Sequence, residues 1–391
     1  MCDQGCGGGN DSERGARSMT VRECTRCIMN SEVDPDLVVV DGICNHCHRY
    51  DALLESRVVP VEQRPAKLAQ VVDAISRAGK GKEYDCIIGV SGGVDSSYVA
   101  LQVKRLGLRP LAVHVDNGWN SALAVLNIER LLRVLDIDLH TEVLRLDEFY
   151  DLQRSFLWSS TPDADVPSDH AIQATLWKIA RQHGVRFIVS GMNFATESIS
   201  VPSWSYGHSD WRYLNDVHRR FGRVPLRTYP HFGFVTLAWT TFVRRVRIVS
   251  ILNYLEYDKS KAVGELVEKL GWVPYEGKHY ESIFTRWVQG FYLPRKFGID
   301  KRRGHYSDLI NSGQITRSAA LEAVLESDYS ERLRAEDEIL LLKKLSLTSE
   351  QLNQIVKRPV ASYRAYRNSY GFVQFLRRTV NRLRKLGLYP R

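Results

Sequence analysis

The chain has 391 residues, of which 44% are hydrophobic and 25% charged, so it can bury a large core and is long enough for two or three modules. No apolar run reaches membrane-spanning length, because the longest uncharged stretch, residues 228–243, has 16 residues and contains Pro230, His231 and Gly233. We therefore expect a globular protein without a transmembrane segment, in which this stretch is buried core.

The formal net charge of +9 comes from the C-terminus. Of the 54 Lys and Arg residues, ten lie in residues 357–391, which contain no Asp or Glu, and the other 44 are balanced by 45 acidic residues. A basic tail with interspersed aromatic residues could follow nucleic acid, bind an anionic membrane surface or dock on a partner. We favour an amphipathic helix that packs its aromatic side chains on the body and leaves its Arg side chains in water. No nucleic acid partner is therefore expected.

Residues 1–19 are rich in Gly, Asn, Asp and Ser and are predicted to form a disordered tail. They contain Asp3, Asp11 and Glu13 but no apolar run, which is not the pattern of a signal peptide. We therefore expect a cytoplasmic protein with free thiols.

Two Cys-x-x-Cys pairs, separated by sixteen residues, have the spacing of a tetrahedral zinc site. The apolar residues 38–40 and the Asp41-Gly42 turn between the pairs predict a small zinc ribbon over residues 20–60. A closed shell of four thiolates has no open position for catalysis, so the zinc is expected to be structural. The predicted ligands are Cys24, Cys27, Cys44 and Cys47.

An alternation of apolar runs and amphipathic segments follows and predicts a doubly wound parallel α/β sheet within residues 61–275. Residues 276–391 are expected to form a helical region that ends in the basic tail. The predicted strands are 85–90, 110–116, 139–144 and 186–190, and the predicted helices are 61–78, 94–106, 121–135, 147–158 and 170–183.

The loop after the first of these strands reads Ser91-Gly92-Gly93-Val94-Asp95-Ser96-Ser97. Two glycines allow close backbone approach to an anion, the serines offer hydroxyl groups, and the helix that follows directs free N–H groups at the same point. The loop lacks the Gly-Lys-Ser/Thr of a Walker motif. It resembles the PP-loop of the ATP pyrophosphatases, which implies ATP as a substrate and cleavage between its α and β phosphates.

In such a sheet, ligands bind beyond the carboxyl ends of the strands, and three strand ends are predicted to converge. Besides the Ser91–Ser97 loop, these are residues 116–120 and 191–197. The resemblance implies adenosine near His114 and Asp116, while Gly191 offers space for close approach to the nucleotide. Asp95 and Glu197 are the predicted magnesium ligands, because Mg²⁺ takes one or two protein carboxylates and completes its shell with phosphate and water. A solvated loop residue is the alternative interpretation of Glu197.

Several motifs together resemble the N-acetyl sugar amidotransferases of lipopolysaccharide biosynthesis, the WbpG-like proteins. They are the two cysteine pairs, the Ser91–Ser97 loop, and residues 116–121, 278–286, 293–303 and 313–317. The resemblance covers about residues 22–325. It implies that an N-acetyl group on a nucleotide-linked sugar becomes an acetamidino group, in the synthesis of a surface polysaccharide such as O-antigen.

The activity that the resemblance implies needs cations for the developing charge, and Lys278 and Arg286 are the candidates beside Asp95. Lys296, Lys301 and Arg302 lie behind them. No glutaminase signature is visible, and Cys86 is the only cysteine after the zinc ribbon. The resemblance therefore implies a separate glutaminase and a cyclase-like subunit that supply ammonia.

Two other interpretations remain open. A tRNA-modifying enzyme of the lysidine synthetase or thiolase type also joins a PP-loop to a zinc module and a basic tail, although Cys86 alone cannot supply the cysteine set of a thiolase. A nucleotide-sensing adaptor would bind ATP without turnover, which the intact Asp95 and the many basic residues of the C-terminal half argue against.

Overall fold

The computed structural model describes residues 21–327 and 329–385, so the tail predicted over residues 1–19 lies outside the described residues. The first module is a hairpin of β1 (Val39–Val40) and β2 (Ile43–Cys44), which pair antiparallel. Its turn residues Asp41 and Gly42 both have positive φ, 50° and 81°, as a two-residue hairpin turn requires. The predicted strand and turn of the ribbon are thus confirmed.

The central sheet has five parallel strands in the order β5-β4-β3-β6-β7. Because the chain moves outward from β3 in one direction and then returns to the other side through β6, the switch point of the sheet lies between these two strands. The predicted doubly wound sheet is confirmed. The strands are β3 (Cys86–Gly89), β4 (Pro110–Asp116), β5 (Leu139–Val143), β6 (Phe187–Ser190) and β7 (Arg247–Ser250).

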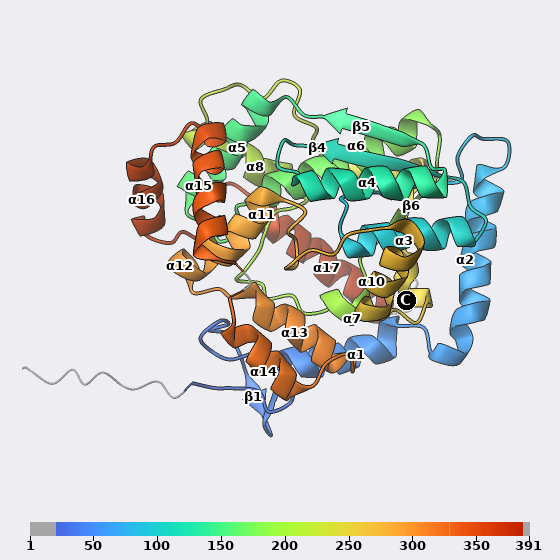
Figure 1. Ribbon diagram of the computed structural model, residues 1–391, viewed down its shortest axis with the longest axis horizontal. Coiled ribbons are helices and arrows are strands. Elements are labelled where there is room, and N and C mark those ends of the chain that lie inside the picture. The colour runs from blue at the N-terminus through green and yellow to red at the C-terminus, as the bar shows by residue number, and fades with distance from the viewer. Residues whose placement is uncertain (1–20, 328, 386–391) are drawn as a thin grey trace, which may run out of the picture.

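Helices cover both faces of this sheet (Figure 1). Four of them share one apolar cluster with the strands, to which Ile75, Val99, Ile128 and Leu266 contribute. On the other face, Ile179 of a single helix packs in a separate cluster with strand residues. The first four helices are α2 (Arg64–Gly79), α3 (Val94–Arg105), α4 (Ala122–Leu135) and α10 (Lys259–Leu270), and the single helix is α6 (Val166–Gln182).

The remaining helices form a mostly C-terminal layer around the largest core cluster, in which Phe284, Trp287 and Tyr292 are fully buried. The predicted helical C-terminal region is confirmed. These helices are α1 (Asn45–Arg57), α5 (Leu146–Ser159), α7 (Phe194–Glu197), α8 (Trp211–Phe221), α11 (Ile283–Trp287), α12 (Leu293–Phe297), α13 (Lys301–Asn311), α14 (Arg317–Leu325), α15 (Glu331–Leu345) and α16 (Ser349–Lys357). None of the helices in the described ranges has the length and apolarity needed to cross a bilayer.

The zinc ribbon packs on this C-terminal layer, below the sheet in Figure 1. Ile28 joins Ala320 and Val324 of α14 in a small apolar cluster. The Arg317 side chain, also on α14, donates hydrogen bonds to the carbonyl oxygens of Cys27 and Cys24 at 3.1 and 3.2 Å. Segments about 290 residues apart in the chain are therefore held together directly.

The prediction that residues 228–243 are buried core holds for Tyr229, Phe232 and Thr240 but is wrong for most of the stretch. Here α9 (Phe234–Ala238) continues into a π-helical turn (Trp239–Val243), and Val235, Trp239 and Phe242 are 84, 53 and 71% exposed. The segment lies at the edge of the sheet beside β7, so one side of it faces the body and the other has nothing to pack on among the described residues. Absence of charge was therefore a poor guide to burial here.

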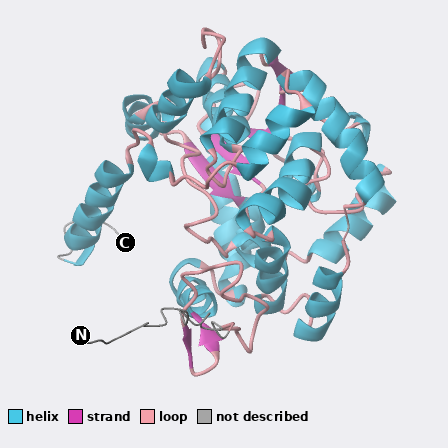
Figure 2. Ribbon diagram, turned by 90° about the vertical axis from the view of Figure 1, so that its left-hand side faces the viewer, coloured by secondary structure: helices cyan, strands magenta, loops and turns pink. Residues whose placement is uncertain are grey.

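The basic tail departs in part from its predicted packing. Tyr363 stacks on Tyr206 with ring centroids 4.0 Å apart, and Tyr366 is buried with its hydroxyl donating to Ser159 O at 2.7 Å. The last helix, α17 (Tyr370–Lys385), instead stands off from the body beside the C-terminus (Figure 2). Its residues Phe372 and Phe375 are 53 and 63% exposed, so these phenylalanines pack less fully than the tyrosines, although the Phe372 ring contacts that of Phe234.

Candidate functional site

The loop predicted to bind phosphate joins β3 to α3 at the switch point of the sheet. Gly93 is the N-cap residue of α3, and within the described part of the chain no side chain caps this helix. The N–H groups of a first helical turn lack intrahelical partners, so they are available to an anion. Ser97 adds a buried hydroxyl that has no hydrogen-bond partner among the described residues. Ser96 Oγ lies 3.2 Å from Ser91 Oγ and donates to Gly93 O at 3.1 Å, which fixes the loop.

Glycine is required at two positions around this loop. Gly92 has a φ of 83°, and a Cβ there would lie 2.7 Å from the carbonyl oxygen of Ala124. A Cβ on Gly191 would lie 3.1 Å from the carbonyl carbon of Asp95. Gly191 was expected to give a nucleotide room to approach. In the structure it allows the end of β6 to pack closely against the first turn of α3.

The two predicted magnesium ligands, Asp95 and Glu197, face the same pocket. Asp95 Oδ1 accepts hydrogen bonds from the hydroxyl of Tyr257 and from Asn193 Nδ2. Burial raises the pKa of Glu197, and the negative charge of Asp95 raises it further. The ammonium group of Lys278, whose Nζ lies 3.8 Å from Glu197 Oε1, acts in the opposite direction and lowers this pKa. Two repelling carboxylates beside an anion-binding loop fit a divalent cation that is completed by phosphate oxygens and water.

This pocket has a volume of about 530 Å³ and lies over the loop and the carboxyl ends of β3 and β6. Among the described residues it is lined by Ser91, Gly93, Val94, Asp95, Ser96, Gly191, Glu197 and Lys278, all within the predicted site segments, and by Lys259, Trp272, Tyr275, His279, Glu281 and His305. Trp272 Nε1 and the Tyr275 hydroxyl both donate to Gly92 O at 3.1 Å. The segment that forms the far wall of the pocket therefore also holds the loop in place.

Sequence reasoning missed several of these lining residues. Lys259 begins α10. Burial lowers the pKa of its ammonium group, and the positive charge of Lys278 lowers that pKa further. His279 has a φ of 65°, and its Nδ1 lies 3.5 Å from Glu281 Oε1. His279 falls inside the run 278–286 that resembles the WbpG-like proteins, and this was the one signal that could have identified it. Nothing in the local sequence marks Lys259 or Trp272 as part of a site.

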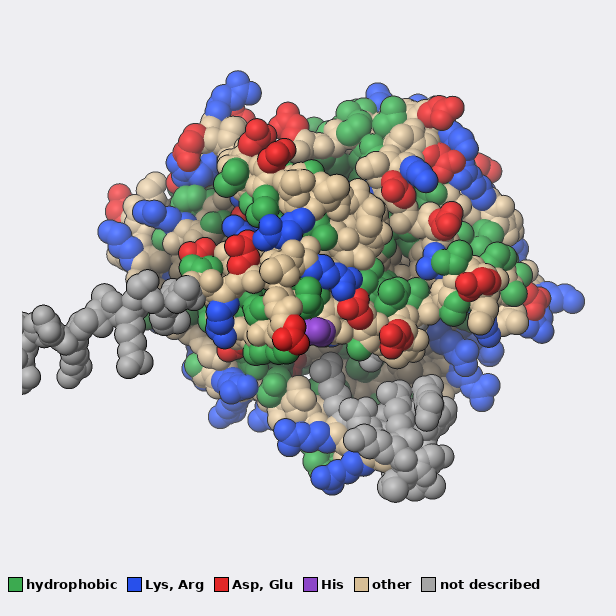
Figure 3. Space-filling model, turned by 90° about the horizontal axis from the view of Figure 1, so that it is seen from below, with side chains coloured by type: hydrophobic (Ala, Val, Ile, Leu, Met, Phe, Trp, Pro, Cys, Tyr) green, Lys and Arg blue, Asp and Glu red, His purple; other side chains and the backbone are tan. Residues whose placement is uncertain are grey.

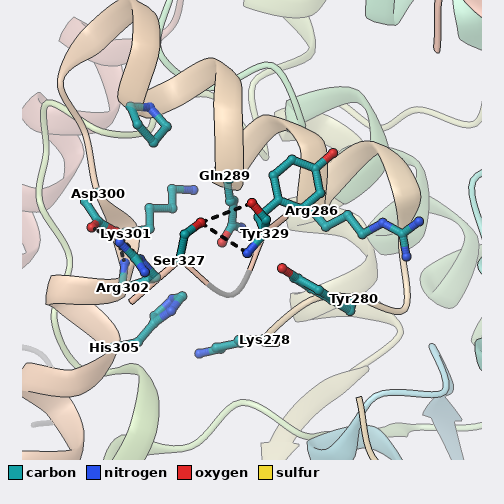
Figure 4. A pocket seen from close by; sticks show the side chains of 12 residues that line it. Lys278, Tyr280, Arg286, Gln289, Asp300, Lys301, Arg302, His305, Ser327 and Tyr329 are labelled. Atoms are coloured by element: carbon teal, nitrogen blue, oxygen red, sulfur yellow. Dashed lines mark hydrogen bonds and ion pairs between the residues drawn. The ribbon is translucent and has the colours of Figure 1, made fainter. Parts of the chain in front are cut away.

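A second, smaller cavity of about 60 Å³ adjoins the first, and Lys278, Arg302 and His305 line both. In Figure 4, Lys278 and His305 lie on one side of it and Lys301 and Arg302 on another. Burial among Lys and His side chains lowers the pKa of His305 well below its ordinary value, so this ring is neutral at pH 7. The cavity therefore presents lysine ammonium groups beside a neutral imidazole.

Arg286 lines the smaller cavity, but its guanidinium points away from the centre (Figure 4). It forms a bidentate ion pair with Asp337 of α15, with N–O distances of 2.7 and 2.6 Å, and Tyr329 donates to the same carboxylate at 2.8 Å. Lys296 is also engaged elsewhere, since its ammonium group donates to the carbonyl oxygens of Ile355 and Arg358 at the end of α16. Of the predicted cations, Lys278 and Arg302 line both cavities.

His114 and Asp116 are not among the described residues that line either pocket. The ring of His114 contacts Val90 O at 2.9 Å and Asn120 Nδ2 at 2.8 Å, and Asp116 Oδ1 accepts from the N–H of Gly118 at 2.9 Å. Both residues shape the turn after β4. Their role as nucleotide contacts stays a prediction.

The four predicted zinc ligands are buried together, with all four Sγ atoms within 4.8 Å of one another. The Cys24–Cys47 and Cys27–Cys44 sulfur distances are 3.9 and 3.7 Å. A tetrahedron with Zn–S bonds of about 2.3 Å has edges of about 3.8 Å, so the cluster fits zinc in size as well as in ligand type. Backbone N–H groups directed at the sulfurs, such as that of Cys44 at 3.3 Å from Cys24 Sγ, would stabilise the thiolates.

Comparison with protein families assigns residues 281–380 to the family described as "LPS biosynthesis protein WbpG-like, C-terminal domain". Residues 281–380 therefore match a WbpG-like C-terminal domain. This match supports the resemblance seen in the sequence over the part that the two ranges share, and its matched range begins at Glu281, on the wall of the larger pocket.

Solved structures similar to this protein include the NMN synthetase from Francisella tularensis, with 15% identity, a TM-score of 0.31, and 71% of this chain and 96% of that chain covered. The NH3-dependent NAD synthetase from Campylobacter jejuni subsp. jejuni NCTC 11168, in complex with the nitrate ion, has 11% identity, a TM-score of 0.29, and 78 and 100% coverage. These likenesses carry no functional argument. None of the curated proteins matches the chain.

Replacing Gly92 with alanine should destabilise the protein by about 2–4 kcal/mol, because a positive φ and an overpacked contact with Ala124 both oppose the new methyl group. Gly107 is the matched control, since it has a φ of 74° and a Cβ added there would meet no described atom within 4 Å. Gly107→Ala should cost only about 1–2 kcal/mol. Urea unfolding of both variants measures the difference, and equal costs would contradict the close approach.

The cysteine cluster should hold about one zinc ion per chain. Cys44→Ser should lose the metal and melt at a lower temperature, because three thiolates no longer close the tetrahedral shell. Cys86→Ser is the control, since Cys86 lies in β3 outside the cluster and should leave the zinc content unchanged. Metal analysis with thermal melting decides the matter; full zinc and unchanged melting in Cys44→Ser would refute a structural zinc site.

Proposed function

We propose that the protein is an ATP-dependent amidotransferase that converts an N-acetyl group of a nucleotide-linked sugar into an acetamidino group during surface polysaccharide synthesis. The observation that carries the proposal is the uncapped anion-binding loop at Gly93, which shares one pocket with two carboxylates and with residues of the WbpG-like C-terminal part. ATP and nucleotide sugars are cytoplasmic metabolites, so the reaction is proposed for that compartment.

In this proposal, residues 61–275 bind ATP. The N–H groups at the start of α3 and the Ser97 hydroxyl bind the departing β and γ phosphates, whose charge the helix N-terminus favours. Asp95 and Glu197 would hold Mg²⁺, which would neutralise phosphate charge as pyrophosphate leaves. Lys259 and Lys278 supply further positive charge from the opposite wall of the pocket.

The acceptor is proposed to reach the α phosphate from the smaller cavity, within the helical region 276–391. The acetamido oxygen attacks the α phosphorus, pyrophosphate leaves, and the amide N–H loses its proton, which gives an O-adenylated imidate. Ammonia then adds to the imidate carbon and AMP leaves, so that the C–O bond breaks and the new C–N bond remains. Lys278 and Lys301 are suited to an anionic group of the sugar, because Arg286 and Arg302 are already paired with Asp337 and Asp300.

Ammonia is proposed to come from a separate glutaminase that works with a cyclase-like subunit. Glutamine hydrolysis by a cysteine needs a thiolate beside a base. Cys86 is fully buried in β3, where burial raises the pKa of its thiol, and the other four described cysteines form the zinc cluster. The described part of the chain therefore offers no cysteine nucleophile suited to glutamine hydrolysis.

Turnover with ATP, ammonium and an acetamido nucleotide sugar should release AMP and pyrophosphate. Asp95→Asn should lower kcat by at least about a hundredfold, since it removes one of two proposed magnesium ligands. Asp73→Asn, on the exposed surface of α2, is the matched control and should keep wild-type turnover. Chromatography of the spent nucleotide gives the result, and accumulation of ADP in place of AMP would rule out the PP-loop chemistry.

The purified chain should form the amidine with ammonium but not with glutamine, and glutamine should work only when a glutaminase is added. Because the nucleophile is neutral ammonia, the ammonium-supported rate should rise with pH until the ammonium pKa is passed. Turnover with glutamine and a channelling partner should depend less on pH, since that ammonia need not equilibrate with solvent. Efficient use of glutamine by this chain alone would exclude a separate glutaminase.

The tRNA-modifying alternative makes a different prediction in the same assays. It requires ATP-dependent modification of tRNA and no product with any acetamido sugar. Salt-sensitive tRNA binding that disappears when residues 357–391 are deleted would favour it.

A further inference from the structure

Two segments far apart in the sequence combine an excess of arginine with exposed apolar side chains. Residues 217–255 contain seven Arg and no Asp, Glu or Lys, and residues 357–391 contain ten Lys and Arg and no acidic residue. In the first segment, Val235, Trp239, Phe242 and Val243 are 84, 53, 71 and 55% exposed. Neither segment was used by the proposed reaction.

The two segments meet in the folded chain. The ring of Phe234 in α9 lies against that of Phe372 in α17, with centroids 5.6 Å apart. The exposed apolar residues of α9 and of the π-helical turn (Trp239–Val243) therefore continue into Phe372 and Phe375 on the projecting α17 (Figure 2). In the view from below, Lys and Arg side chains lie along the lower edge of the molecule, and acidic side chains lie higher in this view (Figure 3).

We define the apolar-basic face as these apolar residues with the exposed arginines next to them. Its members are Val235, Trp239, Phe242, Val243, Phe372 and Phe375, with Arg244, Arg245, Arg247, Arg378 and Arg382. We propose that this face docks the protein on a bilayer that contains anionic lipid. Exposed Trp and Phe side chains can enter the boundary between headgroups and acyl chains, and the arginines complement the headgroup charge.

The position of the apolar-basic face favours a bilayer, and not the subunit that supplies ammonia, as the partner that binds it. The segment that contains Trp239 leads into the amino end of β7, whereas the pocket lies over the carboxyl ends of the parallel strands β3 and β6. A subunit that delivers ammonia must reach that pocket. A membrane bound at the opposite edge of the sheet leaves the pocket open to both ATP and the ammonia source.

Charge complementarity supports the same occupant. Each basic residue near an anionic leaflet contributes about fivefold to partitioning, and insertion of apolar side chains adds to this. Both segments that form the face, residues 217–255 and 357–391, contain no acidic residue. A bilayer surface repels any acidic side chain near it, so this exclusion matches a lipid partner. The exposed apolar and basic residues carry the proposal without the chemistry proposed for the pocket; only the preference for a bilayer over an ammonia-supplying subunit rests on that proposed function, and the test needs no catalytic activity.

The test is cosedimentation of the nuclease-treated full chain with sucrose-loaded vesicles. Vesicles of phosphatidylcholine with about one third phosphatidylglycerol should bind the protein at least about tenfold more tightly than phosphatidylcholine alone, and high salt should weaken this binding. Trp239→Ser with Phe242→Ser should lower the affinity about tenfold by removing the inserted side chains. Arg244→Glu with Arg245→Glu should lower it at least as much.

Matched controls lie elsewhere on the surface. Ile339→Ser on α15 removes an apolar side chain that is 70% exposed, and Arg133→Glu on α4 reverses an exposed charge; both should bind as wild type. Melting temperatures verify that each variant is folded, and Phe375→Ser on α17 replaces the double serine variant if that variant does not fold. Wild-type binding by either double variant, or no preference for anionic vesicles, overturns the proposal. The proposal is also overturned if the wild-type protein does not bind vesicles and the variants instead lose dimerisation or RNA binding.

Discussion

The carbonyl oxygen of Gly92 is the point on which the site depends. It accepts hydrogen bonds from Trp272 and Tyr275, while the α-carbon next to it packs against the backbone of Ala124. These contacts fix the turn that directs the start of α3 into the pocket. Since α3 has no side-chain cap within the described residues, its N-terminal N–H groups remain free for a ligand. The Trp272 and Tyr275 side chains thus position the loop through Gly92 O, while the N–H groups at the start of α3 stay unpaired.

Charge pairing then divides the cations of the site into two sets. Arg286 pairs with Asp337 and so joins α11 to α15, while Arg302 pairs with Asp300 and donates to Val324 O, which joins α13 to α14. Lys278 instead lies 3.8 Å from Glu197, a looser contact than the 2.6 Å of Arg286 with Asp337. A lysine held this loosely can move toward an incoming anion at small electrostatic cost. The arginines therefore join helices, while Lys278 is the cation that could move toward a ligand.

Much of the fold could be predicted from sequence, because buried strands and helices repeat apolar residues at regular intervals. The predicted 110–116 strand agrees with β4 at both ends, and the Ser91–Ser97 loop lies where its glycines and following helix indicated. Strand β7 was missed because Arg247 and Ile248 are exposed, so the strand lacks a buried run. Side-chain partners were the other limit, since no local pattern pairs Arg286 with Asp337, 51 residues away, or brings Lys259 to the phosphate loop.

Helix α13 contacts the zinc ribbon on one side and lines the smaller cavity on the other. Lys301, Arg302 and His305 line the cavities, while Arg303 donates to Ile28 O at 2.8 Å and the hydroxyl of Ser307 accepts from the Ile28 N–H at 3.3 Å. The ribbon therefore braces the wall on which the sugar is proposed to rest and makes no contact of this kind with the phosphate loop among the described residues. Loss of a metal from the four cysteines, or their oxidation, would consequently disturb α13 and the smaller cavity before it disturbed the Ser91–Ser97 loop.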